Sequence, residues 1–155
     1  MSYETHWNTG PHLSPHEAEV LRAVAGFMIP ASSEYDVPGA DDAAIFAEIA
    51  ATLGRDTDVA RKGLRRLEEI AGSRFAGLAT EQKNAALLKL AGSDLPLLSA
   101  LVMVVARCYY RDDRVMRSLG MEVRPPFPQG FELEQGDWSL LDPVKARGRI
   151  WRDAK

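Results

Sequence analysis

Apolar residues recur at intervals of three and four along the first 120 residues of the chain, a spacing typical of amphipathic α-helices. The run Ser14-Pro15-His16-Glu17 is a helix start signal, because Ser14 can cap the helix and Glu17 can complete a capping box. The same spacing returns in five further segments, the last of which ends at Gly120. No strand-like alternation stands out. The pattern therefore predicts an all-α fold, a compact bundle of about six helices.

Two of these helices carry specific expectations. The third begins near Asp56 or Thr57 and keeps its apolar period as far as Leu78, with charged residues on its other sides. The fifth runs from about Asp94 to Arg111 and is apolar nearly all round, which is typical of a central buried helix. We expect four of its residues to form the hub of the core: Leu98, Leu101, Val102 and Val105.

The last 35 residues follow no helical period. They contain four prolines, two of the five phenylalanines and two of the three tryptophans of the chain. Proline keeps such a segment extended, and aromatic side chains dominate the binding energy of protein interfaces. We therefore predict an extended arm that lies either against the chain's own core or against another protein. The expected partner-binding residues are Pro126, Phe127, Phe131, Trp138, Trp151 and Arg152.

These patterns divide the chain into an N-terminal segment at 1–13, a helical bundle at 14–120 and the arm at 121–155, in one domain overall. The net charge of −3 gives no electrostatic reason to expect nucleic acid. The longest uncharged stretch of the fifth helix has twelve residues, fewer than the ~20 that span a membrane. The N-terminus has neither a secretory signal pattern nor a twin-arginine pair, so we expect a cytoplasmic protein.

The sequence carries no motif for a dinucleotide, a phosphate or covalent haem, and no Glu-x-x-His metal pairs. We therefore expect no catalytic, cofactor-binding or metal-binding residues in this chain. Single polar and charged groups have plainer explanations than chemistry. His6, His12 and His16 are expected to be solvated, and Cys108 to be a small buried apolar residue. One residue of the pair Asp112 and Asp113 is expected to cap a helix, and a basic cluster at 61–66 is expected to be a solvated face balanced by Glu68 and Glu69.

Several stretches resemble a known family in their order and spacing. They are FMIPASSEYDVPGADDAAIFAEIAATL, GLRRLEEIAGSRFAGLATEQKNAALLKL, and YYRDDRVMRSLGMEVRPPFPQG followed by WSLLDPVKARGRIWR. Together they look like the gluconate 2-dehydrogenase subunit 3 family, the small subunits of bacterial flavin-dependent dehydrogenases. The resemblance covers nearly the whole chain from Leu13 onward.

The resemblance implies a non-catalytic small subunit that supports the folding, stability or export of a large flavoprotein. That partner is of the glucose-methanol-choline oxidoreductase type, contains FAD and oxidises a sugar or sugar acid. A cytochrome c or a soluble acceptor receives the electrons through the partner. Many members of the family look exported by a twin-arginine signal. Removal of such a signal, or export together with the partner, would place the complex in the periplasm.

Two other functions fit the residues. The chain is alternatively a stand-alone enzyme or small-ligand-binding protein with a pocket inside the bundle, using Arg107, Tyr109 and Tyr110. A homo-oligomeric helical module is the third possibility.

Overall fold

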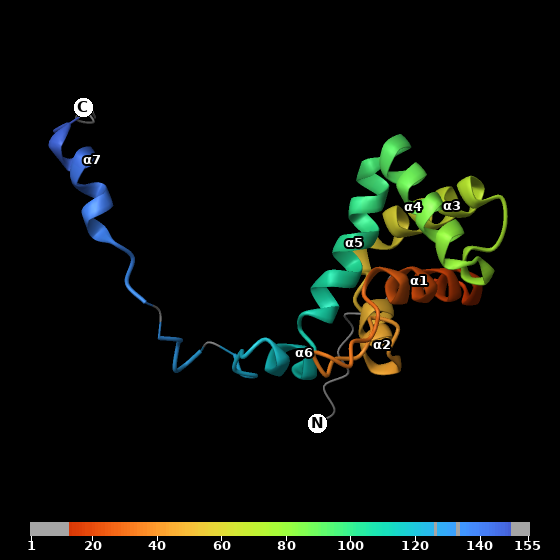
Figure 1. The fold of residues 1–155 in the computed structure, drawn as a ribbon, viewed down its shortest axis with the longest axis horizontal. Coiled ribbons are helices and arrows are strands. Elements are labelled where there is room, and N and C mark those ends of the chain that lie inside the picture. Colours follow the sequence, from red (N-terminus) through yellow and green to blue (C-terminus); the bar gives the residue numbers. More distant parts are fainter. Residues whose placement is uncertain (1–12, 126, 133, 150–155) are drawn as a thin grey trace, which may run out of the picture. The chain divides into compact units, whose positions relative to one another are not determined.

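The computed structural model describes residues 13–125, 127–132 and 134–149, and they form helices joined by short loops (Figure 1). The chain separates into two units, Met1–Val123 and Arg124–Lys155, called here the body and the arm. The α-helices of the body are α1 (Pro15–Met28), α2 (Ala43–Ala51), α3 (Thr57–Ala71), α4 (Thr80–Ser93), α5 (Leu95–Tyr109) and α6 (Asp113–Ser118). Short 3₁₀ turns lie at Gly54–Asp56 and Phe75–Gly77. The predicted all-α class is confirmed, since no strand occurs among the described residues.

The first helix begins where the sequence predicted. The backbone N–H of Glu17 donates to Ser14 Oγ, and the backbone N–H of Ser14 donates to Glu17 Oε2 at 2.8 Å. This capping box satisfies backbone donors that the first turn of a helix otherwise leaves free. The helix ends at Met28, and Ile29 follows as its C-cap.

The third helix ends earlier than predicted. Gly72 adopts a left-handed conformation with φ of +68°, which closes α3 after Ala71. Phe75 nevertheless lies fully buried, but it reaches the core from a separate 3₁₀ turn. The apolar spacing continues in the sequence past the end of the helix because Phe75, in the 3₁₀ turn, packs into the same core as the apolar side of α3.

The core lies between α1, α2, α3, α4 and α5, and its largest buried side chains are Leu21, Ile49, Leu64, Leu67, Phe75, Leu90 and Leu101. Helices α3 and α5 pack closely, because Gly63 of α3 has no side chain to separate them from Leu101. Helix α5 also contacts α2 and α4 and runs along one edge of the body (Figure 1).

The fifth helix is not buried all round, which corrects the prediction. Leu101 and Val105 are fully buried as expected of the hub, whereas Leu98 is half-buried and Val102 is 37% exposed. The error has a simple cause: from Leu95 to Ala106 the helix has no charged residue, so no polar pattern marks its solvent side. The inner face is fixed by its neighbours α2, α3 and α4.

The prolines predicted an arm that is extended throughout, but part of it is helical. A 3₁₀ turn at Trp138–Leu141 leads directly into the short helix α7 (Asp142–Ala146). Asp137 starts this segment, because its carboxylate accepts the backbone N–H of Ser139 at 3.0 Å and the hydroxyl of Ser139 at 2.6 Å. Pro143 occupies the first turn of α7, where its missing N–H costs nothing.

Candidate functional site

The body has a hollowed surface between the loop after α1 and helix α6. One hollow of about 820 Å³ is lined by loop residues 31–33 and 35–38 together with Arg114, Arg117 and Ser118. A smaller hollow of about 310 Å³ adjoins it and shares Ser32, Tyr35, Val37 and Ser118 as lining residues. The smaller hollow is the more apolar, since Ile29, Val115 and Leu119 also line it.

The loop that forms one wall is held by backbone hydrogen bonds. Ser32 and Val37 exchange both of their backbone hydrogen bonds at 3.0 Å, and the N–H of Ala40 donates to the carbonyl of Ile29 at 2.8 Å. Gly39 lets the two ends of the loop approach, because a β-carbon there would lie 2.9 Å from the backbone nitrogen of Ala31. A tight loop with exposed Tyr35 at its tip results.

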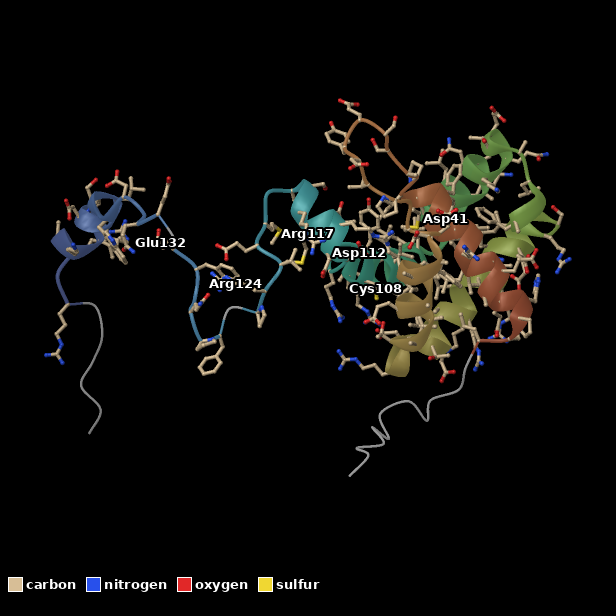
Figure 2. The ribbon with its side chains drawn as sticks, turned by 90° about the horizontal axis from the view of Figure 1, so that it is seen from below. Asp41, Cys108, Asp112, Arg117, Arg124 and Glu132 are labelled. Atoms are coloured by element: carbon tan, nitrogen blue, oxygen red, sulfur yellow. The ribbon has the colours of Figure 1, made fainter. Side chains whose placement is uncertain are left out.

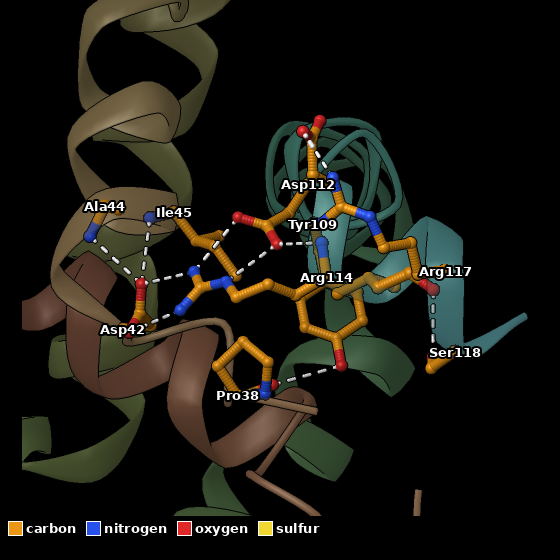
Figure 3. A network of polar contacts seen from close by, with 11 residues as sticks. Pro38, Asp42, Ala44, Ile45, Tyr109, Asp112, Arg114, Arg117 and Ser118 are labelled. Atoms are coloured by element: carbon orange, nitrogen blue, oxygen red, sulfur yellow. Dashed lines mark hydrogen bonds and ion pairs between the residues drawn. The ribbon is translucent and has the colours of Figure 1, made fainter. Parts of the chain in front are cut away.

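Arg114 ties the opposite wall to the rest of the body. Its guanidinium donates to Asp42 at 2.8 Å and to Asp112 at 3.0 Å (Figure 3). Each of these aspartates also caps a helix, since Asp42 accepts backbone N–H groups of α2 and Asp112 accepts the N–H of Arg114 at the start of α6. Hydrogen bonds from the Arg114 side chain hold the pKa of both carboxyl groups below their ordinary values. The sequence predicted a helix cap at either Asp112 or Asp113 but not the bridge, because Asp42 and Arg114 lie 72 positions apart.

Tyr109 supports the loop from below. Its hydroxyl donates to the carbonyl of Pro38 at 3.1 Å (Figure 3). Its ring meets that of Tyr110 edge-on, with centroids 5.2 Å apart. Burial raises the pKa of the Tyr109 hydroxyl above its ordinary value, so this group stays a hydrogen-bond donor at neutral pH. Tyr110 is exposed and lines the smaller hollow. One of the two neighbouring rings is therefore buried and the other lies at the surface.

The residues of the alternative ligand pocket are not brought together. Tyr109 and Tyr110 line the smaller hollow, but Arg107 is not among its lining residues. Arg107 instead forms an ion pair with Asp56 and donates to the carbonyl of Thr52 at 2.8 Å. It therefore anchors α5 to the segment before α3.

The plainer explanations hold for Cys108 and Arg66, whereas Arg61 and His16 differ from what was expected, since His16 pairs with Glu68. Cys108 is buried and lies 3.2 Å from the hydroxyl of Thr52. In the basic cluster Arg66 pairs with Glu69 at 3.0 Å on an exposed surface, as expected. Arg61 differs, because it is only 24% exposed and pairs with Glu17 of α1 at 3.3 Å. It joins two helices and does not belong to a solvated face.

Glu17 takes part in both the cap of α1 and the pair with Arg61. Burial alone would raise its pKa, but hydrogen bonds from Ser14 and the Arg61 guanidinium bring the pKa below its ordinary value. His16, on the same turn, lies 2.7 Å from Glu68 and 3.3 Å from Arg74. The other two histidines, His6 and His12, lie outside the described residues. Within the described part of the chain, no group of three or more acidic, histidine or cysteine side chains could hold a metal ion.

The arm holds three of the six predicted partner-binding residues within the described structure. Phe127 is 84% exposed, Trp138 is 65% exposed, and Phe131 is 45% exposed beneath Arg124, whose guanidinium lies 4.4 Å from the ring centre. Arg124, which is labelled in Figure 2, also donates to the carbonyl of Gly130 at 2.8 Å. Pro126, Trp151 and Arg152 lie outside the described residues. The arm thus orders one aromatic ring against an arginine and buries none of the three within itself.

Comparison with protein families gives a match to gluconate 2-dehydrogenase subunit 3 over residues 15–121. The chain belongs to this family. The match spans all six helices of the body and stops at Met121, so the arm lies outside it. The resemblance noted in the sequence had included the arm as well. Comparisons with curated proteins and with solved structures gave no match.

Membership of this family makes the chain a subunit of a multi-subunit dehydrogenase. The described helices include none that is long and apolar enough to cross a membrane.

Proposed function

We propose that this chain is a non-catalytic accessory subunit of an FAD-dependent sugar or sugar-acid dehydrogenase. Its role is to support the folding, stability and solubility of the large flavoprotein subunit. The family match over residues 15–121 carries the proposal. The sequence supports it, because it contains no recognisable phosphate-binding or dinucleotide-binding motif that would hold a flavin.

The arm is the proposed docking element for the flavoprotein. Within the arm, Phe127 and Trp138 remain largely exposed, and such rings contribute strongly to affinity when a partner buries them. Prolines at 125, 126 and 128 restrict the free segment, so less conformational entropy is lost on docking. Pro126, Trp151 and Arg152 complete the proposed contact set on the basis of sequence.

The remaining features of the complex follow from this role. FAD belongs to the large subunit, and the electrons leave through that subunit to a cytochrome c or a soluble acceptor. We propose a cytoplasmic complex, with the periplasm as its location if the subunits are exported together. The small subunit contributes no redox group of its own.

Co-expression tests the proposal directly. We expect a reading frame for a large FAD-binding dehydrogenase beside the gene for this chain, and its product is the probe, expressed with and without the chain. We expect the two proteins to co-elute in a fixed ratio with a flavin absorption band, and the yield of soluble flavoprotein to fall sharply without the chain. A flavoprotein that is equally soluble and active alone, and that does not co-elute, would contradict the proposed function. The isolated chain is expected to be colourless. A flavin or haem absorption band at stoichiometric level in the isolated chain would also contradict the proposed function.

A further inference from the structure

The outer face of α5 is apolar although it is exposed. Three of its large side chains point away from the core: Leu95 is 59% exposed, Val102 37% and Met103 62%. Ser99, Ala106 and the C-cap residue Tyr110 complete the same face, at positions i+4, i+11 and i+15 from Leu95. At 100° per residue these six positions fall within about 100° of the helix circumference, so they form one stripe. We call it the α5 face.

The α5 face differs from the outer surface of α3, another long helix of the body. Helix α3 presents charged residues outward, among them Lys62, Arg65 and Arg66. From Leu95 to Ala106, by contrast, α5 contains no charged residue on any side. Exposed apolar patches of this kind on soluble proteins usually mark sites of contact.

The stripe continues into the hollow described above. Tyr110 ends the α5 face and also lines the smaller hollow, together with Leu119 of the α6 end and Val37 of the loop. Helix and hollow thus offer a continuous uncharged surface, with a concave end that a side chain of a partner can fill. Both parts lie within residues 15–121, the region shared with the family.

We propose that the α5 face, with the hollow at its Tyr110 end, is a second docking surface for the large dehydrogenase subunit. This inference rests on the proposed function. The occupant is an uncharged, apolar surface of that subunit, because a charged group placed against this face would be desolvated without an ion partner. The family match includes all of α5 and none of the arm, so a surface by which family members join their complex is expected in the body.

The size of the face favours the large subunit over a second copy of this chain. A stable interface buries about 800 Å² and 20–30 residues on each partner, and a stripe of six positions with its hollow supplies only part of that. A large subunit that also receives the arm gains the rest from the same chain. Two surfaces on one chain also raise the effective concentration of the second contact once the first has formed.

Charge substitution on the face is the first test. Met103→Glu in the full chain places a carboxylate in the proposed interface, and we expect at least about a tenfold loss of co-purified large subunit. Leu88→Glu is the matched control, because Leu88 is 64% exposed on a different helix, α4. It should leave co-purification unchanged. Both variants should keep the helical signal and melting temperature of the parent chain, since neither side chain is buried.

The two proposals fail in different ways. If the unaltered chain does not bind the large subunit, the proposed function is wrong. If it binds and Met103→Glu binds equally well, only the α5 face is wrong. Equal loss with Leu88→Glu would also contradict a specific role for this face.

Methionine footprinting is the second test and needs no substitution. Dilute peroxide oxidises accessible methionine sulfur, so Met103 should react readily in the isolated chain and become protected in the complex. Half-buried Met116 serves as the internal reference. Protection of Met103 in the isolated chain that increases with concentration would show that a second copy covers the face. Protection independent of concentration would show that the chain covers its own face. Either result overturns the proposal.

Discussion

Gly63 of α3 packs directly against Leu101 of α5. A β-carbon at Gly63 would lie 3.1 Å from Cγ of Leu101 and 3.3 Å from the carbonyl oxygen of Leu97. The backbone oxygen cannot move away as a side chain can. The spacing of the two helices therefore depends on the missing side chain of a single residue.

Gly63→Ala should destabilise the body although alanine favours a helix. Alanine gains about 1 kcal/mol over glycine inside a helix, but overpacking of a core costs about 1–3 kcal/mol, so we expect a net loss of about 1 kcal/mol. Gly92→Ala in α4 is the matched control, because a β-carbon there meets nothing within 4 Å. That change should stabilise by up to about 0.5–1 kcal/mol. Urea unfolding of both variants tests the prediction, and equal signs would contradict it.

Leu101 itself should be among the most sensitive positions of the fold. It is fully buried between α5 and its neighbours, so Leu101→Ala removes apolar contacts and leaves a cavity that costs about 2–5 kcal/mol. Met103→Ala, two residues along the same helix, should change stability by no more than about 0.5 kcal/mol because its side chain is 62% exposed. The comparison isolates burial from helix position. A larger effect at Met103 would show that the register of α5 is wrong.

Much of this fold could be read from the sequence, and the failures share a cause. The cap at Ser14 was predicted, and the cap of α6 was narrowed to Asp112 or Asp113, because capping depends on residues within three positions of each other. The exposure of Val102 was not predictable. The residues from Leu95 to Ala106 are all uncharged, so their sequence does not show which side of α5 packs against its neighbours. The end of α3 at Gly72 was not predicted, because the buried Phe75 beyond it kept the apolar period intact.

The candidate site was harder to predict for a related reason. Arg114 bridges Asp42 and Asp112, and only the second of these is its neighbour in sequence. Arg61 was predicted to lie on a solvated face, but it pairs with Glu17 on another helix. Long-range ion pairs have no local pattern, so they emerge only when the fold brings the elements together. The composition of the arm predicted its aromatic character. Its short helix α7 was not predicted, because proline is typical of extended segments and is also accepted in the first turn of a helix.

Arg114→Gln should loosen the attachment of α6 to α2. The substitution leaves Asp42 and Asp112 without their shared cation, and we expect a loss of about 0.5–1 kcal/mol at pH 7, the range for partly exposed ion pairs. Arg117→Gln is the matched control on the same helix. Its pair with Asp113 at 3.3 Å is solvent-exposed on both sides, so its loss should be close to zero. Chemical denaturation at pH 7 separates the two variants.

The pH dependence of this network has a definite sign. The folded-state pKa values of Asp42 and Asp112 lie below the ordinary value of 3.8. Their contribution to stability is therefore fully present above that value and is lost as the pH falls through the lower folded-state values. The Arg114→Gln variant should lose less stability than the parent chain between about pH 4 and pH 2. Parallel acid unfolding curves for both proteins would contradict the assigned network.

The arm provides the sharpest test of the docking role. Deletion of residues 131–155 should leave the helices of the body folded, because the caps and core that form them lie within residues 14–119. The same deletion should abolish co-purification of the large flavoprotein and so lower the recovered dehydrogenase activity. Circular dichroism of the truncated chain and a pull-down of the flavoprotein are measured side by side. A melted helical signal would show that the arm belongs to the chain's own core.

Single substitutions in the full chain then distinguish specific anchoring from mere length. Trp138→Ala removes a large ring that the arm leaves 65% exposed, and a buried aromatic anchor costs at least about 2 kcal/mol when truncated, or roughly thirtyfold in affinity. Leu140→Ala is the control, because Leu140 is exposed in the same turn but lacks the ring. We expect weakened capture with the first variant and nearly unchanged capture with the second. A truncated chain that still captures the flavoprotein at full yield would place the contact entirely in the body, where the α5 face would have to carry it alone.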